Sequence, residues 1–71
     1  MSKPKYDLVG IDGNAYAIMA YVSRAMKEQK FNRRQIDRYI ARAKKKDYNH
    51  LLMVSITYID KCNERAKHTN K

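Results

Sequence analysis

The sequence has few of the residues that cross-link a chain or interrupt its helices: one cysteine, one proline, two glycines and no tryptophan in 71 residues. Because Cys62 is the lone cysteine, it cannot form an internal disulfide, and we expect a free thiol in the reducing cytoplasm. With 44% hydrophobic residues and so little proline and glycine, the composition does not favour disorder. The length suits a single small domain, residues 1–71, with frayed ends at about 1–5 and 66–71.

Long apolar runs are also missing. No stretch approaches the roughly 20 apolar residues that a membrane-spanning helix needs. The opening segment, MSKPKYDLVG, has neither the apolar core nor the small-residue cleavage site of a secretory signal. We therefore expect no membrane partner.

Acidic residues are scarce, with seven aspartates and glutamates against sixteen lysines and arginines, for a net charge of +9. Most of the excess lies in residues 32–46, where seven basic side chains and the single acid Asp37 give +6. The seven are Arg33, Arg34, Arg38, Arg42, Lys44, Lys45 and Lys46. Such a segment attracts nucleic acid, an acidic protein or an anionic surface.

Apolar residues that recur with a helical period predict the first two helices. Over about 14–29, one face of about 120° gathers Ala15, Ile18, Met19, Val22, Ala25 and Met26. A second helix is predicted over about 33–45. Asn32 is a good N-cap for it, and Gln35 stands where it completes a capping box.

The third helix is predicted over about 48–64, after Asp47 as N-cap. Its apolar residues cover about 200° of the helix, which is more than one partner helix requires. We therefore predict a mainly α fold, a compact three-helix domain in which the third helix is central. A short extended segment at about 6–11 precedes the helices.

The extended segment YDLVGI, residues 6–11, cannot satisfy its own backbone hydrogen bonds as a single strand. It must lie over the helices, pair with the same segment of a second copy, or pair with a strand at 15–22. In the last case Asp12 and Gly13 would form a hairpin turn. The alanines and the 3.6-residue period favour a helix instead, capped by Asp12 or Asn14, with Gly13 supplying an unusual backbone angle.

No constellation of residues indicates catalysis or ligand chemistry. Counted from Asp12, position 12 of a calcium loop is Ser23 rather than glutamate, which excludes an EF-hand. His50 and His68 have no partner at metal-ligand spacing, and Cys62 lies on an apolar face. We expect a non-enzyme with no catalytic residue, no cofactor, no metal and no small-molecule substrate.

The basic segment carries the strongest functional signal. One face of about 80°, opposite the apolar stripe, holds Arg34, Arg38, Arg42 and Lys45, and Arg33, Lys44 and Lys46 flank it. A solvated helix face usually mixes charges of both signs, whereas this one has a single acid. The pattern predicts contact with nucleic-acid phosphates and weak sequence specificity, because the following helix is mostly apolar.

A mildly apolar strip on the outer side of the first helix is the alternative interface, formed by Tyr16, Ala17, Ala20 and Tyr21. It would contact a protein partner, while residues 6–11 would join two copies in a homodimer. The structural explanation is tyrosine at a core margin, where its ring packs and its hydroxyl meets water.

Two motifs carry a resemblance to known sequences. The first is VG-x-DGNA-aromatic, formed by Val9, Gly10, Asp12, Gly13, Asn14, Ala15 and Tyr16. The second is DYNHLL, Asp47–Leu52, at the start of the third helix. Over about residues 6–64 the chain resembles a group of short uncharacterised bacterial, phage and prophage proteins. The resemblance implies a cytosolic protein of a mobile element with no enzyme assignment, and it transfers no functional residues.

Overall fold

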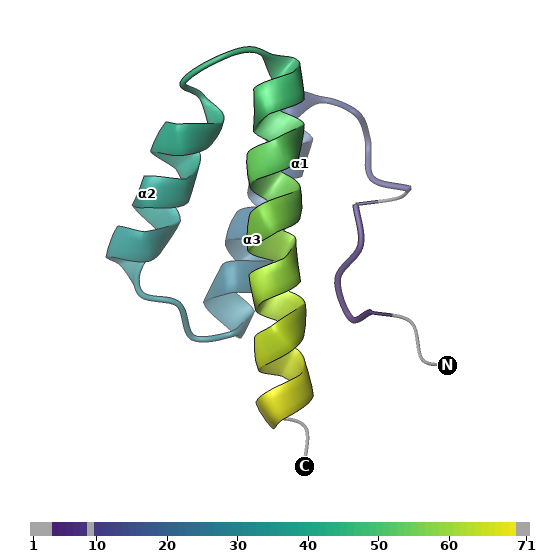
Figure 1. Ribbon diagram of the computed structural model, residues 1–71, viewed down its shortest axis with the longest axis vertical. Coiled ribbons are helices and arrows are strands. Elements are labelled where there is room, and N and C mark those ends of the chain that lie inside the picture. The colour runs from purple at the N-terminus through teal and green to yellow at the C-terminus, as the bar shows by residue number, and fades with distance from the viewer. Residues whose placement is uncertain (1–3, 9, 70–71) are drawn as a thin grey trace.

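The computed structural model describes residues 4–8 and 10–69, and these form three helices and no strand. The helices are α1 (Ala15–Glu28), α2 (Arg33–Ala43) and α3 (Tyr48–Thr69). Figure 1 shows α2 running opposite to α1 and α3, with α3 in front of the other two. The predicted mainly α, three-helix fold is confirmed, and α3 contacts both other helices.

The last helix is longer than the sequence pattern indicates. α3 ends at Thr69 rather than near residue 64, so residues 66–69, expected to be frayed, belong to the helix. No glycine or proline follows Cys62, and Ala66 and Lys67 are good helix formers. The amphipathic pattern stops where the helix leaves the core, whereas the helix itself continues.

The helix starts follow the predicted capping residues. The Asn14 side chain accepts a hydrogen bond from the Tyr16 N–H at 2.8 Å and caps α1. Asn32 and Gln35 form the reciprocal capping box of α2, with N···O distances of 2.8 and 3.0 Å. At the start of α3, the Asp47 carboxylate accepts from the backbone N–H of the third helical residue at 3.0 Å.

One prediction about the corner before α1 was wrong. Gly13 was expected to supply the unusual backbone angle, but the positive φ, +89°, is found at Gly10. Asp12 is not the cap either, since its carboxylate accepts from the Asn14 N–H at 3.3 Å inside the turn. The corner is therefore two turns in succession, with the left-handed residue three positions earlier than expected.

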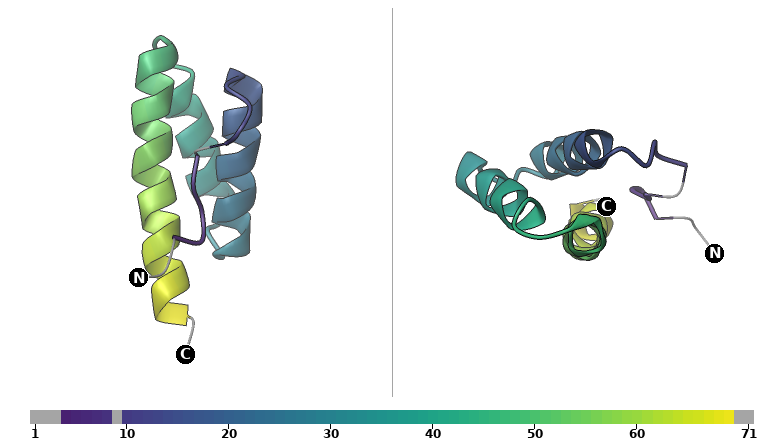
Figure 2. Two further views of the ribbon diagram at one scale, coloured as in Figure 1. Left: turned by 90° about the vertical axis from the view of Figure 1, so that its right-hand side faces the viewer. Right: turned by 90° about the horizontal axis from the view of Figure 1, so that it is seen from above.

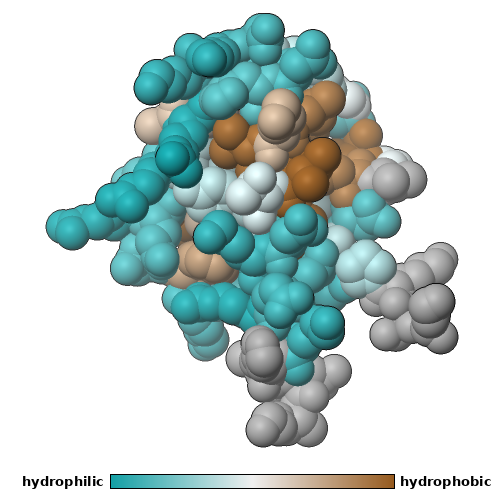
Figure 3. Space-filling view, in the orientation of Figure 1, coloured by the Kyte–Doolittle hydropathy of each residue, from teal (hydrophilic) through white to brown (hydrophobic). Residues whose placement is uncertain are grey.

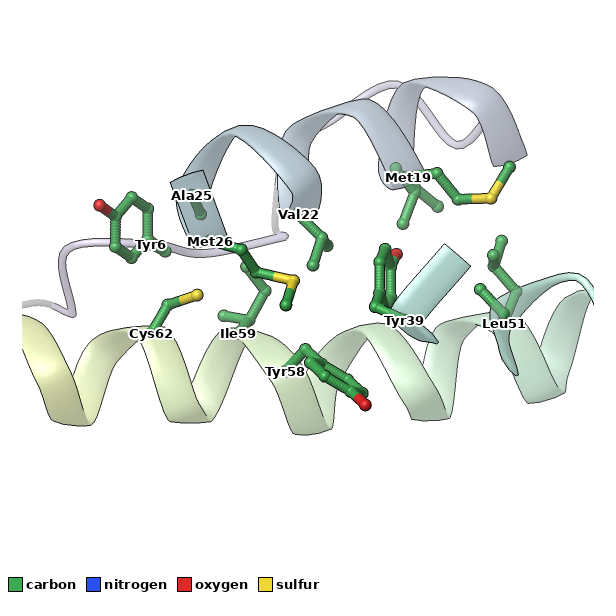
Figure 4. Close-up of a cluster of buried hydrophobic side chains, with 12 residues drawn as sticks. Tyr6, Met19, Val22, Ala25, Met26, Tyr39, Leu51, Tyr58, Ile59 and Cys62 are labelled. Atoms are coloured by element: carbon green, nitrogen blue, oxygen red, sulfur yellow. The ribbon is translucent and has the colours of Figure 1, made fainter. Parts of the chain in front are cut away.

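The core lies between the three helices (Figure 4). Tyr39 points inward from α2 and is fully buried, its ring 5.1 Å from that of Tyr58 between centroids. Its hydroxyl lies 2.7 Å from the Ser55 hydroxyl, so two buried polar groups satisfy each other. Figure 4 also shows Tyr6 near Cys62 at one end of this core.

The N-terminal segment lies over the helices of its own chain, between α1 and α3 (Figure 2). Tyr6 is buried there, and the Asn63 side chain makes two hydrogen bonds to its backbone. The Tyr6 N–H donates to Asn63 Oδ1 at 2.8 Å, and Asn63 Nδ2 donates to the Tyr6 carbonyl at 3.0 Å. The Asn63 side-chain amide thus makes the two backbone hydrogen bonds that a neighbouring strand would otherwise supply. The first of the three alternatives is the observed one, and the hairpin is excluded because residues 15–22 are helical.

Candidate nucleic-acid interface

All seven basic side chains of residues 33–46 are exposed. Within residues 4–8 and 10–69, no carboxylate forms an ion pair with any of the seven; the pair that is present joins Lys67 to Glu64 at 3.9 Å. Even Asp37, one turn from Arg33 and Arg34, makes no such pair. The positive charge of this segment is therefore not neutralised by the protein.

The fold distributes the α2 arginines over both sides of the helix. Arg38 and Arg42 line a groove between α2 and α3, where Lys61 of α3 also lies. Arg33 lines a different groove, between α1 and α2, together with Arg24 and Lys27 of α1. The basic surface is thus wider than one helix face, and three of its side chains come from the neighbouring helices.

Sequence reasoning missed Arg24, Lys27 and Lys61 because they lie outside the basic segment. The signal for the first two was present, since both lie opposite the apolar face of α1. The sequence did not show that α2 lies beside these side chains, because the groove forms only when α2 packs against α1. Arg34 and Lys45, the other members of the predicted face, are exposed outside both grooves.

A third groove lies where α1 begins, α2 ends and α3 begins. It brings together Lys44 and Lys46 with two tyrosines from other elements, Tyr16 of α1 and Tyr48 of α3. The sequence placed one aromatic residue, Tyr39, within the basic segment, and that residue is buried. Exposed aromatic rings stand beside the lysines only through the tertiary fold.

The predicted strip on the outer side of α1 is divided between different surroundings. Tyr16 is 76% exposed at the groove just described, and Ala20 lines the groove between α1 and α2. Ala17 is half-buried. The Tyr21 hydroxyl accepts a hydrogen bond from the Asp7 N–H at 2.9 Å and so helps to hold the N-terminal segment. These four residues do not form one free apolar surface.

The opposite end of the molecule is a network of internal hydrogen bonds around Tyr6. Its hydroxyl donates to Glu28 Oε1 at 2.7 Å and accepts from Gln29 Nε2 at 2.8 Å. The Arg65 guanidinium donates to the Gln29 carbonyl at 2.6 Å and lies 4.2 Å from the centre of the Phe31 ring. Polar groups here hold the N-terminal segment at Tyr6 and the later part of α3 at Arg65 against the end of α1.

Burial raises the pKa of three groups in the interior. Desolvation is the main cause for the Tyr6 and Tyr39 hydroxyls and for the Cys62 thiol, whose pKa rises to about 11. At neutral pH Cys62 is therefore a protonated, buried thiol, which is a poor nucleophile and a poor metal ligand.

The described residues contain no cluster of three or more histidine, cysteine, aspartate or glutamate side chains that would hold a metal ion. His50 Nε2 instead lies 3.0 Å from the Arg42 carbonyl, which connects α3 to the end of α2. The His68 side chain lies outside the described part. No helix in this part of the chain has the length and apolar character to span a membrane.

Comparison with known proteins adds no relative to these observations. The chain matches no protein-family model, no curated protein and no solved structure. The resemblance to short bacterial and phage proteins stays a prediction from the two sequence motifs. Any function must therefore be argued from the geometry of the surface.

Proposed function

We propose that the protein is a small non-enzymatic module that binds the phosphate backbone of nucleic acid through α2 and the lysines that follow it. The observation that carries the proposal is the set of seven exposed basic side chains without an internal ion pair. Arginine binds phosphate oxygens through two parallel hydrogen bonds, and lysine adds a mobile point charge. Together these side chains form a surface that is complementary in charge to a polyanion.

The wider basic surface supports a long phosphate track. Arg38, Arg42 and Lys61 flank one side of α2, while Arg33 and Lys27 lie on the other. Such contacts carry no base information, so we expect similar affinity for different sequences. If about four phosphates are neutralised, a plot of the logarithm of the binding constant against the logarithm of salt concentration has a slope of about −3.6 for duplex DNA and about −2.8 for a single strand.

The proposal is tested by fluorescence anisotropy with labelled oligonucleotides. The salt concentration is varied over about 50–300 mM, where the affinity of a phosphate-binding protein falls steeply. A variant with Arg34→Gln, Arg38→Gln and Arg42→Gln should lose at least about tenfold in affinity and flatten the salt slope. The matched control carries Lys5→Gln, Lys30→Gln and Lys67→Gln, which removes the same charge elsewhere.

The two variants separate a local surface from net charge. Selective loss in the arginine variant supports the proposal. Equal loss in both variants would show that binding depends on overall charge alone. Absence of any retention of DNA or RNA by the unaltered protein at low salt would remove the proposal altogether.

A protein–protein module is the second candidate function. Met53 is 69% and Ile56 52% exposed on α3, and Figure 3 shows hydrophobic surface over this part of the molecule. Self-association through residues 6–11 is less favoured, because Tyr6 already has its hydrogen-bond partners within the chain. Sedimentation that shows a monomer at high concentration would remove the homodimer.

We place the protein in the cytoplasm of a bacterium or phage-infected cell. The free, buried thiol of Cys62 suits a reducing compartment. The motifs around Asp12–Asn14 and Asp47–Leu52 support an origin in a mobile element. A pull-down from host lysate with and without nuclease tests the nucleic-acid partner, since a nucleic-acid-mediated association disappears after nuclease treatment.

A further inference from the structure

The groove at the upper end of the bundle combines features that the α2 surface lacks. In Figure 1 the start of α1, the end of α2 and the start of α3 meet at this end. The groove measures about 470 Å³, which falls within the range of about 300–1,000 Å³ typical of small organic ligands. Its floor includes the buried side chains of Met19 and Leu51.

The two tyrosines of this groove differ in how they are held. The Tyr48 hydroxyl donates to the Gly13 carbonyl, so this ring is fixed against the corner before α1. Tyr16 stands in the first turn of α1, 76% exposed, and its hydroxyl has no hydrogen-bond partner among the described residues. The face of the Tyr16 ring is therefore exposed to solvent, beside the Tyr48 ring, which is held in place by its hydrogen bond.

Positive charge borders the aromatic rings. Lys44 and Lys46 line the groove and are exposed, and neither forms an ion pair with a described residue. One acid, Asp47, lies there too, but its carboxylate accepts from the His50 N–H at the start of α3. α1 and α3 begin at this end and α2 ends there, so the positive ends of two helix dipoles outweigh the negative end of one.

We propose that this groove binds an unpaired base of single-stranded nucleic acid, which stacks on Tyr16 while Lys44 and Lys46 contact the flanking phosphates. Aromatic rings amid basic side chains are the features by which proteins hold single strands. A duplex cannot use them, since its base faces are already stacked inside the helix. The proposal rests on the proposed function and adds to it the class of nucleic acid.

The geometry also gives the strand a path out of the groove. Lys45 follows Lys44 directly and Arg42 precedes it by two residues; both are exposed, and Arg42 lines the groove between α2 and α3. A strand anchored by one base at Tyr16 can thus continue along the positive charge of α2. The base site fixes the kind of nucleic acid, and the α2 surface supplies most of the electrostatic attraction.

The test compares three probes: a labelled single strand, the same strand with abasic sites, and its duplex. Tyr16→Ala should weaken binding of the normal single strand by about tenfold, as expected when one stacked base is lost. It should leave the abasic strand and the duplex unchanged. Tyr16→Phe keeps the ring and should restore affinity, while Met53→Ala, on an exposed residue outside the groove, is the matched control.

A spectroscopic signature distinguishes stacking from a general surface effect. The chain has no tryptophan, so Tyr16→Trp introduces a single reporter at the groove. Its fluorescence should be quenched by the normal single strand and not by the abasic strand. Quenching of equal size by both strands would show that no base stacks at this position.

The outcomes for the two proposals differ. If single strand and duplex bind equally and Tyr16→Ala changes neither, the base site is wrong while phosphate binding by α2 stands. If neither the single strand nor the duplex binds at low salt, both proposals are wrong. Selective loss of single-strand binding in Tyr16→Ala, with recovery in Tyr16→Phe, supports the base site.

Discussion

Around Tyr6, the polar groups that are shielded from water have partners inside the chain, whereas the arginines along α2 face solvent and form no ion pair with a described carboxylate. Throughout the described residues, no buried side-chain nitrogen or oxygen lacks a hydrogen-bond partner. The contrast is therefore between polar groups that form hydrogen bonds within the fold and charged groups that form no ion pair within it.

The difference is the basis of the proposal that the region around Tyr6 serves stability and α2 serves a partner. Hydrogen bonds around Tyr6 connect segments far apart in the chain and offset the cost of burying polar atoms. Along α2, Arg34, Arg38 and Arg42 are spaced by four residues, and like charges at that spacing destabilise a helix slightly. A surface that costs stability and stays exposed supports the proposal that α2 binds a partner.

The largest expected effect on stability is at Tyr6. Tyr6→Ala removes a buried ring and a hydroxyl with two partners, so the free energy of unfolding should fall by about 3 kcal/mol. Urea unfolding measures the change. Tyr16→Ala is the control, because the side chain is 76% exposed, and it should cost no more than about 0.5 kcal/mol. Equal costs in the two variants would contradict the contrast.

A smaller loss is expected at Asn63. Asn63→Ala leaves the N–H and carbonyl of Tyr6 without partners, which should cost about 2 kcal/mol. Asn63→Asp can accept from the N–H but cannot donate to the carbonyl, so its stability should lie between that of the unaltered protein and that of Asn63→Ala. Urea midpoints and hydrogen exchange of the Tyr6 amide report the result. The exposed Asn49 supplies the control, and an equal cost of Asn49→Ala would show that the Asn63 contacts do not matter.

High pH should weaken the interior of the protein. Folding raises the pKa of Cys62 from 9.0 to about 11, so the native state holds a proton that the unfolded chain releases first. This stability is present below pH 9 and is lost as the pH rises toward 11. The raised pKa values of Tyr6 and Tyr39 act in the same direction above pH 10.

Each such group contributes a slope of up to about 1.4 kcal/mol per pH unit. Urea unfolding between pH 7 and 11 in reducing buffer measures it, and Cys62→Ala should make the slope shallower. An unchanged unfolding free energy across this range would mean that these groups ionise freely in the folded protein.

The sequence predicted the helices because their signals are local. The Asn32–Gln35 capping box and the Asp47 cap lie within one turn, and both form as expected. The position of the left-handed residue was wrong, since Gly10 and Gly13 both precede α1 and composition does not distinguish them. The end of α3 was also missed, because the amphipathic pattern ends before the helix does.

The sites depend on contacts that no local pattern records. The hydrogen bonds between Tyr6 and Asn63 join residues separated by 57 positions. The upper groove likewise combines side chains of three helix ends, so that Tyr16 meets Lys44 only after folding. The basic charge of α2 was readable from composition, whereas its neighbours and the aromatic rings beside it were not.

The smallest expected effect on stability is at the arginines themselves. Replacing Arg34, Arg38 and Arg42 together by glutamine should change the free energy of unfolding by no more than about 0.5 kcal/mol, or raise it slightly by relieving repulsion. Urea unfolding and nucleic-acid binding are measured on the same sample. Near-normal stability with lost binding completes the contrast with Tyr6. A loss above about 1 kcal/mol would instead assign these side chains to the fold, and the reason to regard α2 as a binding surface would disappear.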